Sequence, residues 1–295
     1  MQTICNTKTA RTKRIIGYTI YYVFAALLAF YFLLPFFVLV TRSFMTVDEV
    51  GQTLLPASFN FGNYSNIFAI DSKVDILRSL FNSLTVMFFK TVGTVFSSFI
   101  CAYALSRIKF FGRKFLFSFG MMTIMLPGIV TTISLYALYD KIHWTGTLYP
   151  LILPAWFGGG MMTIFLEMQF MKSVSNTMDE AALIDGANHL QIAFGIYLPL
   201  IIPVIIYIAI TTAIGSWNDF MAPLTYITKG SYEKYTLPLA FYYKYQSTGG
   251  DDPARTRPNE QAALGIFMML PIFVLFSLFK DRMIKGISLE GGIKG

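Results

Sequence analysis

The side chains that could perform chemistry are few in this 295-residue chain, and their spacing does not build an active site. Only two histidines occur, His143 and His189, and neither has a serine, cysteine or carboxylate partner at a recognisable spacing. The two cysteines, Cys5 and Cys101, show neither a disulfide pattern nor metal-ligand spacing. The chain also has no sequence of the P-loop type that holds the phosphates of ATP. We therefore expect no catalytic residue, no metal site and no cofactor on this chain, and no ATP hydrolysis by the chain itself.

The strongest local pattern is a polar stretch over residues 177–199, which we call the polar loop. It is too polar to span a membrane, yet it separates two segments that are apolar enough to do so. Thr177, followed three residues later by Glu180, has the spacing of a capping box, which predicts a short helix over residues 179–185. Gly186 is expected to end this helix, because glycine adopts the left-handed cap conformation at little cost.

A second helix start follows in the same loop. Asn188 and Gln191 have the capping-box spacing and predict a second short helix that ends before Leu198 and Pro199. Two small helices joined by a turn on the membrane face form a projection that another protein could hold. The polar loop therefore indicates a docking element rather than an active site.

The rest of the chain must supply the elements that position this loop. Hydrophobic residues make up 55% of the chain and charged residues 13%, whereas soluble domains carry about a quarter charged residues. A bilayer core takes about 20 apolar residues per helix, so we expect an all-α polytopic membrane bundle of six helices. The predicted spans are Ile16–Val40, Leu84–Ser106, Phe115–Leu138, Leu148–Phe170, Leu198–Ile227 and Ala262–Phe279.

The distribution of charge predicts the orientation of the chain. The net charge is +7, and the segments on one side of the predicted spans hold thirteen basic and five acidic residues. The loops on the other side hold nine of each. Because basic residues concentrate on the cytoplasmic side, both termini are expected in the cytoplasm of a multi-pass cell-membrane protein. This distribution explains the positive charge without a nucleic-acid partner.

Four regions are predicted from the positions of the spans. Residues 1–15 form a basic cytoplasmic tail, and residues 16–78 contain the first membrane helix and a long outer loop. Residues 79–280 form the core transmembrane domain, and residues 281–295 form a cytoplasmic C-terminal tail. The first span lacks a small-residue cleavage site, so we expect it to be retained as an anchor.

Several segments of the chain carry a family resemblance. Within the polar loop they are Glu180-Ala181-Ala182, Asp185-Gly186-Ala187 and Leu198-Pro199. Elsewhere they are Phe61-Gly62-Asn63-Tyr64, Phe81-Asn82-Ser83-Leu84, Ala102-Tyr103-Ala104-Leu105-Ser106-Arg107, Trp217-Asn218-Asp219-Phe220 and Gly292-Ile293-Lys294-Gly295. The polar loop resembles the "EAA" loop of binding-protein-dependent ABC importer permeases. Together the segments resemble the carbohydrate-uptake branch, and specifically its smaller, six-span maltose-type permease subunit.

This resemblance implies a function and a set of partners. The polar loop would be a cytoplasmic two-helix coupling loop that contacts ATPase subunits through Glu180, Ala181, Ala182, Asp185, Gly186, Leu198 and Pro199. The partners would be a second permease subunit in a heterodimer, two cytoplasmic ATPase subunits and an extracytoplasmic solute-binding protein. ATP and Mg would bind to the ATPase subunits. The solute would be a sugar or an oligosaccharide that is carried into the cytoplasm.

Two further groups are candidates for contacts with the solute and its receptor. Trp217, Asn218 and Asp219 lie in the predicted fifth span, where a charge is costly and usually faces a cavity or a partner. We expect these residues either to border the solute pathway or to form a polar contact between helices that fixes their packing. Gly249, Gly250, Asp251 and Asp252 form a glycine-rich tip of the second long outer loop, which we expect to contact the binding protein.

Two alternatives remain open at this point. A permease of the same family could carry a non-sugar solute such as a polyamine or a phosphate ester, because all members share the coupling loop. An ion-coupled secondary transporter would need a relay of ionisable residues in the membrane. Lys90, Glu167 and Asp219 are few and scattered for that purpose, and Lys90 is expected to extend outward to the interface from near one end of its span.

Overall fold

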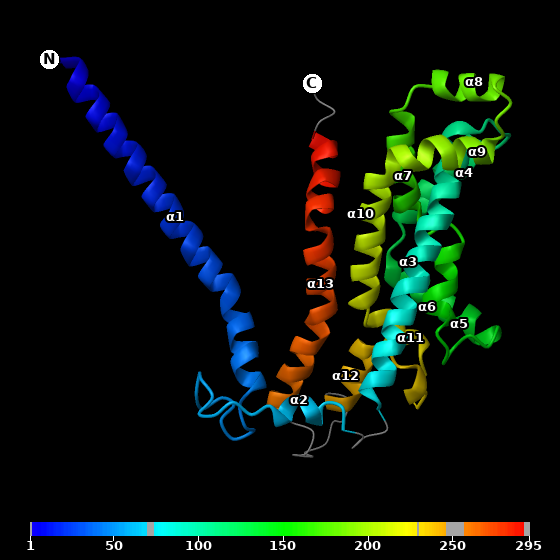
Figure 1. Ribbon diagram of the computed structural model, residues 1–295. Helices are drawn as coiled ribbons and strands as arrows, with labels where there is room; N and C mark the ends of the chain where they lie inside the picture. The colour runs from blue at the N-terminus through cyan, green and yellow to red at the C-terminus, as the bar shows by residue number, and fades with distance from the viewer. Residues whose placement is uncertain (1, 70–73, 229, 246–256, 292–295) are drawn as a thin grey trace. The chain divides into compact units, whose positions relative to one another are not determined.

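The computed structural model describes residues 2–69, 74–228, 230–245 and 257–291, and these residues are helical with no β-strand among them (Figure 1). The longer helices are α1 (Gln2–Ser43), α3 (Ile76–Arg107), α4 (Arg113–Ile124), α5 (Gly128–Lys141), α7 (Met161–Lys172), α10 (Leu198–Trp217) and α13 (Pro258–Gly291). The shorter helices are α2 (Gly62–Asn66), α6 (Tyr149–Ile152), α8 (Thr177–Ile184), α9 (His189–Ile192), α11 (Met221–Tyr226) and α12 (Leu237–Tyr245). The 3-10 turns are Leu153–Trp156 and Tyr232–Lys234, and a π-helical turn covers Ala193–Tyr197. The all-α prediction is confirmed.

Five segments in the described residues are long and apolar enough to cross a membrane. They are Ile16–Ser43, Ile76–Arg107, Tyr149–Lys172, His189–Trp217 and Pro258–Lys280. Each corresponds to one of the predicted spans, so the chain is a multi-pass membrane protein. The second span starts at Ile76 instead of Leu84, which makes its helix about two turns longer than expected.

The predicted third span, Phe115–Leu138, is not a continuous helix. It is divided between α4 and α5 by a break at residues 125–127, and neither helix alone has the length of a span. Pro127 explains the break, because proline has no N–H and disfavours the α conformation of the residue before it. Five of the six predicted spans thus correspond to membrane-length segments, and the third corresponds to the interrupted pair α4 and α5.

The predicted fourth span is also interrupted, at the three glycines 158–160, all of which have positive φ. At Gly159, with φ +64°, a Cβ atom would lie 2.8 Å from the backbone oxygen of Thr94. Only glycine permits this approach between the chain before α7 and helix α3. The glycines thus permit close packing, and they also carry the chain out of the helical conformation.

Helix α10 differs from the predicted fifth span at both of its ends. At its start, α9 continues through the π-helical turn into α10, so the second short helix does not end before Leu198. In the π turn the Leu198 N–H donates to the carbonyl of Ala193. This wider turn precedes Pro199, which has no N–H to donate to the helix. At its other end α10 stops at Trp217, ten residues before the predicted end at Ile227.

The chain divides into two compact units, residues 1–67 with 251–268 and residues 68–250 with 269–295. In the first unit, Asn63 is buried and its amide donates to the carbonyls of Ser43 and Met45, each at 2.8 Å. The Asn259 amide donates to the side-chain oxygen of Asn63 at 2.8 Å. Asn63 therefore fixes the end of α1 against α2, which explains its place in the Phe61–Tyr64 segment.

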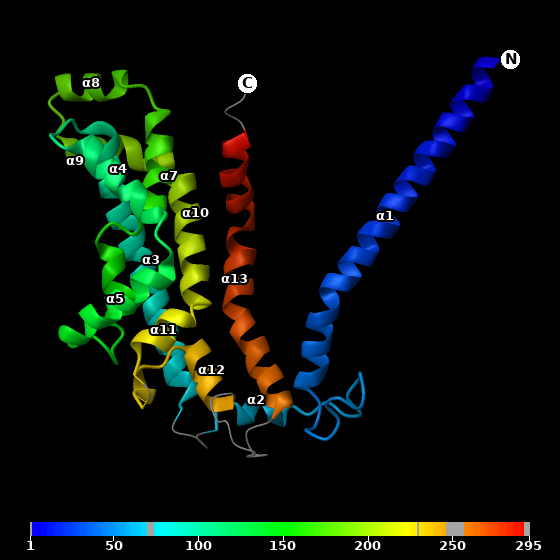
Figure 2. The ribbon, with the colours of Figure 1, turned by 180° about the vertical axis from the view of Figure 1, so that it is seen from behind.

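The second unit is built around α3, which packs against α10, α7 and α12 (Figure 2). The C-terminal half of α3 contributes Phe99, Ala102 and Tyr103 to a buried cluster with residues of α7 and the π turn. Met168 and Tyr197 are buried in the same cluster. Helices α8 and α9 lie at the end of α3 and α10 that carries this cluster, so the polar loop rests on a packed base.

Candidate functional site

The polar loop forms the two short helices that were predicted, but its first helix is capped differently. The expected capping box between Thr177 and Glu180 is wrong, because Thr177 is already the first residue of α8 and no side chain caps the helix. The Thr177 hydroxyl instead lies 2.8 Å from the hydroxyl of Ser175, whose Oγ also accepts the Thr177 N–H. Glu180 is left exposed to solvent.

The end of α8 and the start of α9 follow the sequence prediction. Gly186 has φ +83°, and the N–H groups of Gly186 and Ala187 donate to the carbonyls of Leu183 and Ala182. This double closure is a Schellman motif, which requires the left-handed residue that glycine supplies. At the start of α9, the Asn188 N–H donates to Gln191 Oε1 at 2.8 Å and the Gln191 N–H to Asn188 Oδ1 at 2.9 Å. The second capping box is confirmed.

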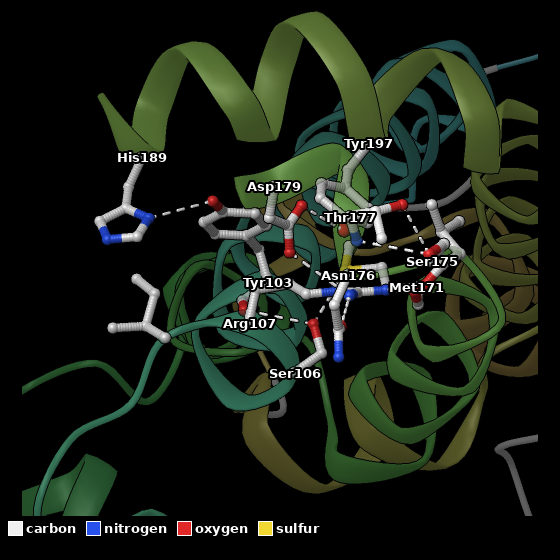
Figure 3. A network of polar contacts seen from close by, with 12 residues as sticks. Tyr103, Ser106, Arg107, Met171, Ser175, Asn176, Thr177, Asp179, His189 and Tyr197 are labelled. Atoms are coloured by element: carbon white, nitrogen blue, oxygen red, sulfur yellow. Dashed lines mark hydrogen bonds and ion pairs between the residues drawn. The ribbon is translucent and has the colours of Figure 1, made fainter. Parts of the chain in front are cut away.

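Arg107, the last residue of α3, anchors the polar loop (Figure 3). Its side chain is 4% exposed, and its guanidinium donates to the backbone carbonyls of Met171 and Val174, the latter at 2.7 Å. It also donates to the side-chain oxygen of Asn176 and to Asp179 Oδ2, at 3.3 Å in the second case. One buried cation thus joins the end of α3 to the end of α7 and to the first turn of α8.

Two tyrosines complete this anchor. The Tyr197 hydroxyl donates to Asp179 Oδ1 at 2.5 Å, and the Arg107 guanidinium carbon lies 4.7 Å from the centre of the Tyr197 ring. The ring of Tyr103 packs on Tyr197 at 5.6 Å, and its hydroxyl lies 3.3 Å from His189 Nδ1. Both oxygens of Asp179 are therefore occupied, one by α3 and the other by the turn that enters α10 (Figure 3).

The opposite side of the polar loop is open. Of the expected coupling residues, Glu180, Ala181, Asp185, Gly186 and Pro199 are exposed, and Ala182 and Leu198 are half-buried. Large apolar side chains are exposed beside them, namely Met178, Leu183, Ile184 and Leu190. Ala182 packs against the buried cluster, so its small size serves contact with the membrane helices. Helix α8 thus has one side fixed by Asp179 and another that presents an apolar and acidic surface.

Sequence reasoning missed the residues of the anchor. Arg107 was part of a family-like segment and was counted as one of the positive charges on the inner side, and Tyr103 and Tyr197 were given no role. The available signal was a basic residue in the last turn of a span. A positive charge there interacts favourably with the free carbonyls at the helix end and with nearby carboxylates. Neither its partner Asp179, 72 positions away, nor the fit of the tyrosines can be read from local spacing.

Of the candidate pathway residues, Trp217 ends α10, whereas Asn218 and Asp219 follow the helix. Trp217 is buried at the end of α10, and Asn218 is exposed in the position that follows the helix. Asp219 Oδ1 accepts the Ala222 N–H at 3.1 Å and so caps α11. The expectation that these residues lie within the fifth span holds for Trp217 and is corrected for Asn218 and Asp219, whereas their role in solute passage stays a prediction.

Lys90 does not extend to the interface as expected. It lies in the middle of the lengthened α3, and its Nζ is 3.6 Å from Asp219 Oδ2. The exposed fractions of the two side chains are 30% and 24%, so the pair is only partly shielded from its surroundings. Two of the three charges that seemed scattered in the sequence thus form one pair that links α3 to the break between α10 and α11.

Glu167, on α7, is fully buried and lies apart from this pair. Its Oε1 accepts the hydroxyl of Ser98 at 3.1 Å, about two turns along α3 from Lys90. No group of three or more histidine, cysteine or acidic side chains within the described residues could hold a metal ion. The expected receptor-contact residues Gly249, Gly250, Asp251 and Asp252 lie outside the described residues.

Comparisons with known proteins give consistent results. The family described as "Binding-protein-dependent transport system inner membrane component" matches residues 93–288. The chain is 28% identical to the inner membrane ABC transporter permease protein YcjP of Escherichia coli, over 97% of this chain and all of that protein. It is 27% identical to the galactooligosaccharides transport system permease protein GanQ of Bacillus subtilis, over 83% and 84% of the two chains.

A further relative and a solved structure complete the comparison. The trehalose/maltose transport system permease protein MalG of Thermococcus litoralis is 26% identical over 92% of this chain and 95% of its own length. A chain in the crystal structure of a bacterial ABC transporter for import of the acidic polysaccharide alginate superposes with a TM-score of 0.79. At 20% identity, with 92% and 97% of the two chains covered, this likeness establishes the fold.

Proposed function

The chain belongs to the family of binding-protein-dependent transport system inner membrane components, and we propose that it carries a sugar or oligosaccharide into the cytoplasm. Members of this family are transport subunits and not enzymes. Support for a sugar comes from relatives named for galacto-oligosaccharides and for trehalose and maltose. A non-sugar solute is the alternative.

The assembly that we propose contains a second permease subunit, two cytoplasmic ATPase subunits and an extracytoplasmic binding protein. ATP and Mg would be held by the ATPase subunits. This chain would supply the polar loop as the surface that the ATPase subunits grip. Both termini and the polar loop would lie in the cytoplasm, as the excess of basic residues on that side favours.

The observation that carries this proposal is the buried attachment of α8 to two membrane helices. A force applied to the exposed side of α8 reaches α3 through Arg107 and Asp179, and it reaches α10 through Tyr197. Because a packed interior transmits displacement rather than absorbing it, movement of the ATPase subunits would turn the helices that line the solute path. The sugar would then be released to the cytoplasmic side.

An ion-coupled mechanism has little support in these contacts. Asp219 is occupied by Lys90 and by the start of α11, and Glu167 is enclosed beside Ser98 about two turns of α3 away. These carboxyl groups do not line up as a relay across the membrane.

Reconstitution of the chain with its partner subunits in proteoliposomes tests the proposed function. Uptake of labelled neutral oligosaccharides should require both internal ATP and the loaded binding protein. A matched preparation with ADP in place of ATP should show no uptake. Uptake that follows an imposed ion gradient without ATP would contradict the proposal, and uptake of polyamines or phosphate esters alone would replace the sugar as solute.

A further inference from the structure

A series of aromatic rings extends from the break after α10 into α12, all within the second unit. Phe220 packs on Tyr242 with 5.3 Å between ring centres, and Tyr242 packs on Tyr243 at the same distance. Tyr243 stacks on Tyr235 at 4.9 Å and 20°, and Tyr235 contacts Tyr232 at 5.4 Å. We call Phe220, Tyr232, Tyr235, Tyr242 and Tyr243 the ring series.

The exposure of these rings suits a surface that a ligand can touch. Tyr235 is completely buried and supports its neighbours, whereas Phe220, Tyr232, Tyr242 and Tyr243 are half-buried. Rings on α1 differ, since Tyr21, for example, is 66% exposed. The four half-buried rings are fixed by their contacts and still reach the surface.

The ring series carries hydroxyl groups close together. Burial raises the pKa of the Tyr243 phenol, and the neighbouring phenols of Tyr242 and Tyr232 raise it further. The phenols of Tyr242 and Tyr232 therefore both lie within electrostatic reach of the Tyr243 phenol. Each phenol can donate one hydrogen bond and accept others, which matches the alternating needs of sugar hydroxyls.

The ring series ends at a polar group with balanced charge. Phe220 follows Asp219, which pairs with Lys90 at 3.6 Å, and the exposed amide of Asn218 lies next to it in the chain. Both charged side chains are about a quarter to a third exposed, so they can also meet a ligand. An aromatic surface with a few fixed polar groups is the usual composition of a small-molecule site.

The location of the ring series also fits a solute that arrives from outside. Lys90 is about 25 Å along α3 from Arg107, close to the thickness of a bilayer core. Helices α11 and α12 lie at the end of α10 opposite α8 and α9 in both views (Figures 1 and 2). The ring series is therefore on the far side of the membrane from the polar loop.

We propose that the ring series, with Asn218 and the Lys90–Asp219 pair at its inner end, is a binding track for neutral sugar rings on this subunit. The track rests on the proposed function and adds to it a site and a preference for uncharged sugars. Aromatic faces pack against the C–H side of a sugar ring, while the phenols and the polar end bind its hydroxyls. Lys90 is paired with Asp219, so the inner end of the track carries no net charge toward an acidic sugar.

A fluorescence titration of the purified importer complex tests binding directly. Tyr242→Trp places a reporter in the track, and Tyr21→Trp places the same reporter at an exposed position of α1. Maltotriose and galactotriose serve as neutral probes, and trigalacturonate serves as the charged probe. The fluorescence change of the unaltered complex is subtracted from that of each variant. The remaining change should saturate with at least one neutral probe for Tyr242→Trp, and it should be absent for Tyr21→Trp.

Transport measurements supply a second readout. Tyr242→Ala should lower the maximal rate of sugar uptake at saturating binding protein by about tenfold, since it removes one aromatic contact. Tyr242→Phe keeps the ring face and should stay within about twofold of the unaltered importer, as should Tyr21→Ala. Equal amounts of assembled complex in detergent would exclude a folding defect as the cause.

Several results would overturn the track. Normal uptake by Tyr242→Ala together with no saturable signal from Tyr242→Trp would show that the rings only pack. An equal response to trigalacturonate would remove the preference for neutral sugars. Loss of binding-protein-stimulated ATPase activity without a change in sugar response would assign the rings to a protein contact. In each case sugar uptake by the unaltered importer would leave the proposed function intact.

Discussion

Arg107 and Asp179 form a 3.3 Å ion pair across 72 positions of the chain, with side chains that are 4% and 18% exposed. The pair joins the end of a membrane helix to the first turn of α8, a helix whose other side is exposed. Loss of one member leaves the other charge buried without its partner, which costs more than the pair itself contributes.

Arg107→Gln should therefore destabilise the chain by about 3–5 kcal/mol and disconnect α8 from α3. Thermal unfolding in detergent should show the loss of stability, and transport per ATP hydrolysed should fall in the assembled importer. Lys109→Gln removes the same charge from an exposed neighbouring position and should change neither quantity. Similar stability of the two variants would disprove the anchoring role of Arg107.

Glu180→Lys should act on the partner contact instead of on the fold. Glu180 is exposed, so reversal of its charge should leave stability and membrane insertion unchanged while it uncouples ATP hydrolysis from transport. Asp48→Lys, an equal charge change in an exposed outer loop, is the control. A cysteine at Ala181, which is exposed, should cross-link to an ATPase subunit. Normal transport with normal stimulated ATPase activity in Glu180→Lys would refute the contact.

The Lys90–Asp219 pair can be separated from the capping role of Asp219. Asp219→Asn removes the charge and keeps a side-chain oxygen that can accept the Ala222 N–H at the start of α11, whereas Asp219→Ala removes both functions. We expect Asp219→Asn to slow transport with little loss of stability, and Asp219→Ala to lose about 1 kcal/mol more. The charge exchange Lys90→Asp with Asp219→Lys should recover part of the transport. Additive effects in this double variant would show that the two charges do not interact.

Gly159→Ala should destabilise the chain, because its Cβ atom would lie 2.8 Å from the Thr94 carbonyl oxygen and because φ is +64°. The α3 backbone cannot yield easily at this point, so a loss of about 1–3 kcal/mol is expected. Gly215→Ala in α10 is the control, since nothing lies within 4 Å of its new Cβ atom. Unfolding of the purified chain in detergent should separate the two variants, and equal midpoints would contradict the close approach.

The orientation of the chain can be tested with reporter fusions. Fusions at residues 10 and 110 and after Gly295 should report the cytoplasm, and a fusion at Ser58 should report the outside. The reason is the excess of basic residues on one side of the spans. A cytoplasmic signal at Ser58 would require a different membrane topology.

The parts of the site that depend on local backbone requirements could be predicted from sequence. Gly186 could be identified because glycine adopts the left-handed conformation that ends a helix. The Asn188–Gln191 pair could be identified because a reciprocal cap needs two suitable residues three positions apart. Thr177 has the same local signal, yet Ser175 competes for its hydroxyl and the helix begins one residue earlier than the capping box requires.

Contacts between distant positions could not be predicted in this way. Lys90 was expected to turn outward because the start of its helix was placed at Leu84, and the true start at Ile76 moves it away from the helix end. Its partner Asp219 then depends on where α10 stops, and Asn218 and Asp219 fit equally well as polar residues inside a longer apolar span and as the end of the helix. The break at Pro127 was visible as a proline, but whether a proline bends or divides a membrane helix depends on the surrounding packing.

The π-helical turn at Ala193–Tyr197 sets how α9 is rotated about the helix axis relative to α10. A π turn holds one residue more than the α-helical turn it replaces, and one residue corresponds to about 100° around the helix axis. Deleting a single residue there would convert the π turn to an α turn of nearly the same rotation, so α9 would keep its orientation relative to α10. A deletion in the α-helical part of the same run has no extra residue to remove and would turn the exposed face of α9 by about 100°. The π turn therefore lets the helical run lose one residue without re-aiming α9 and without any change in the side chains that α9 exposes.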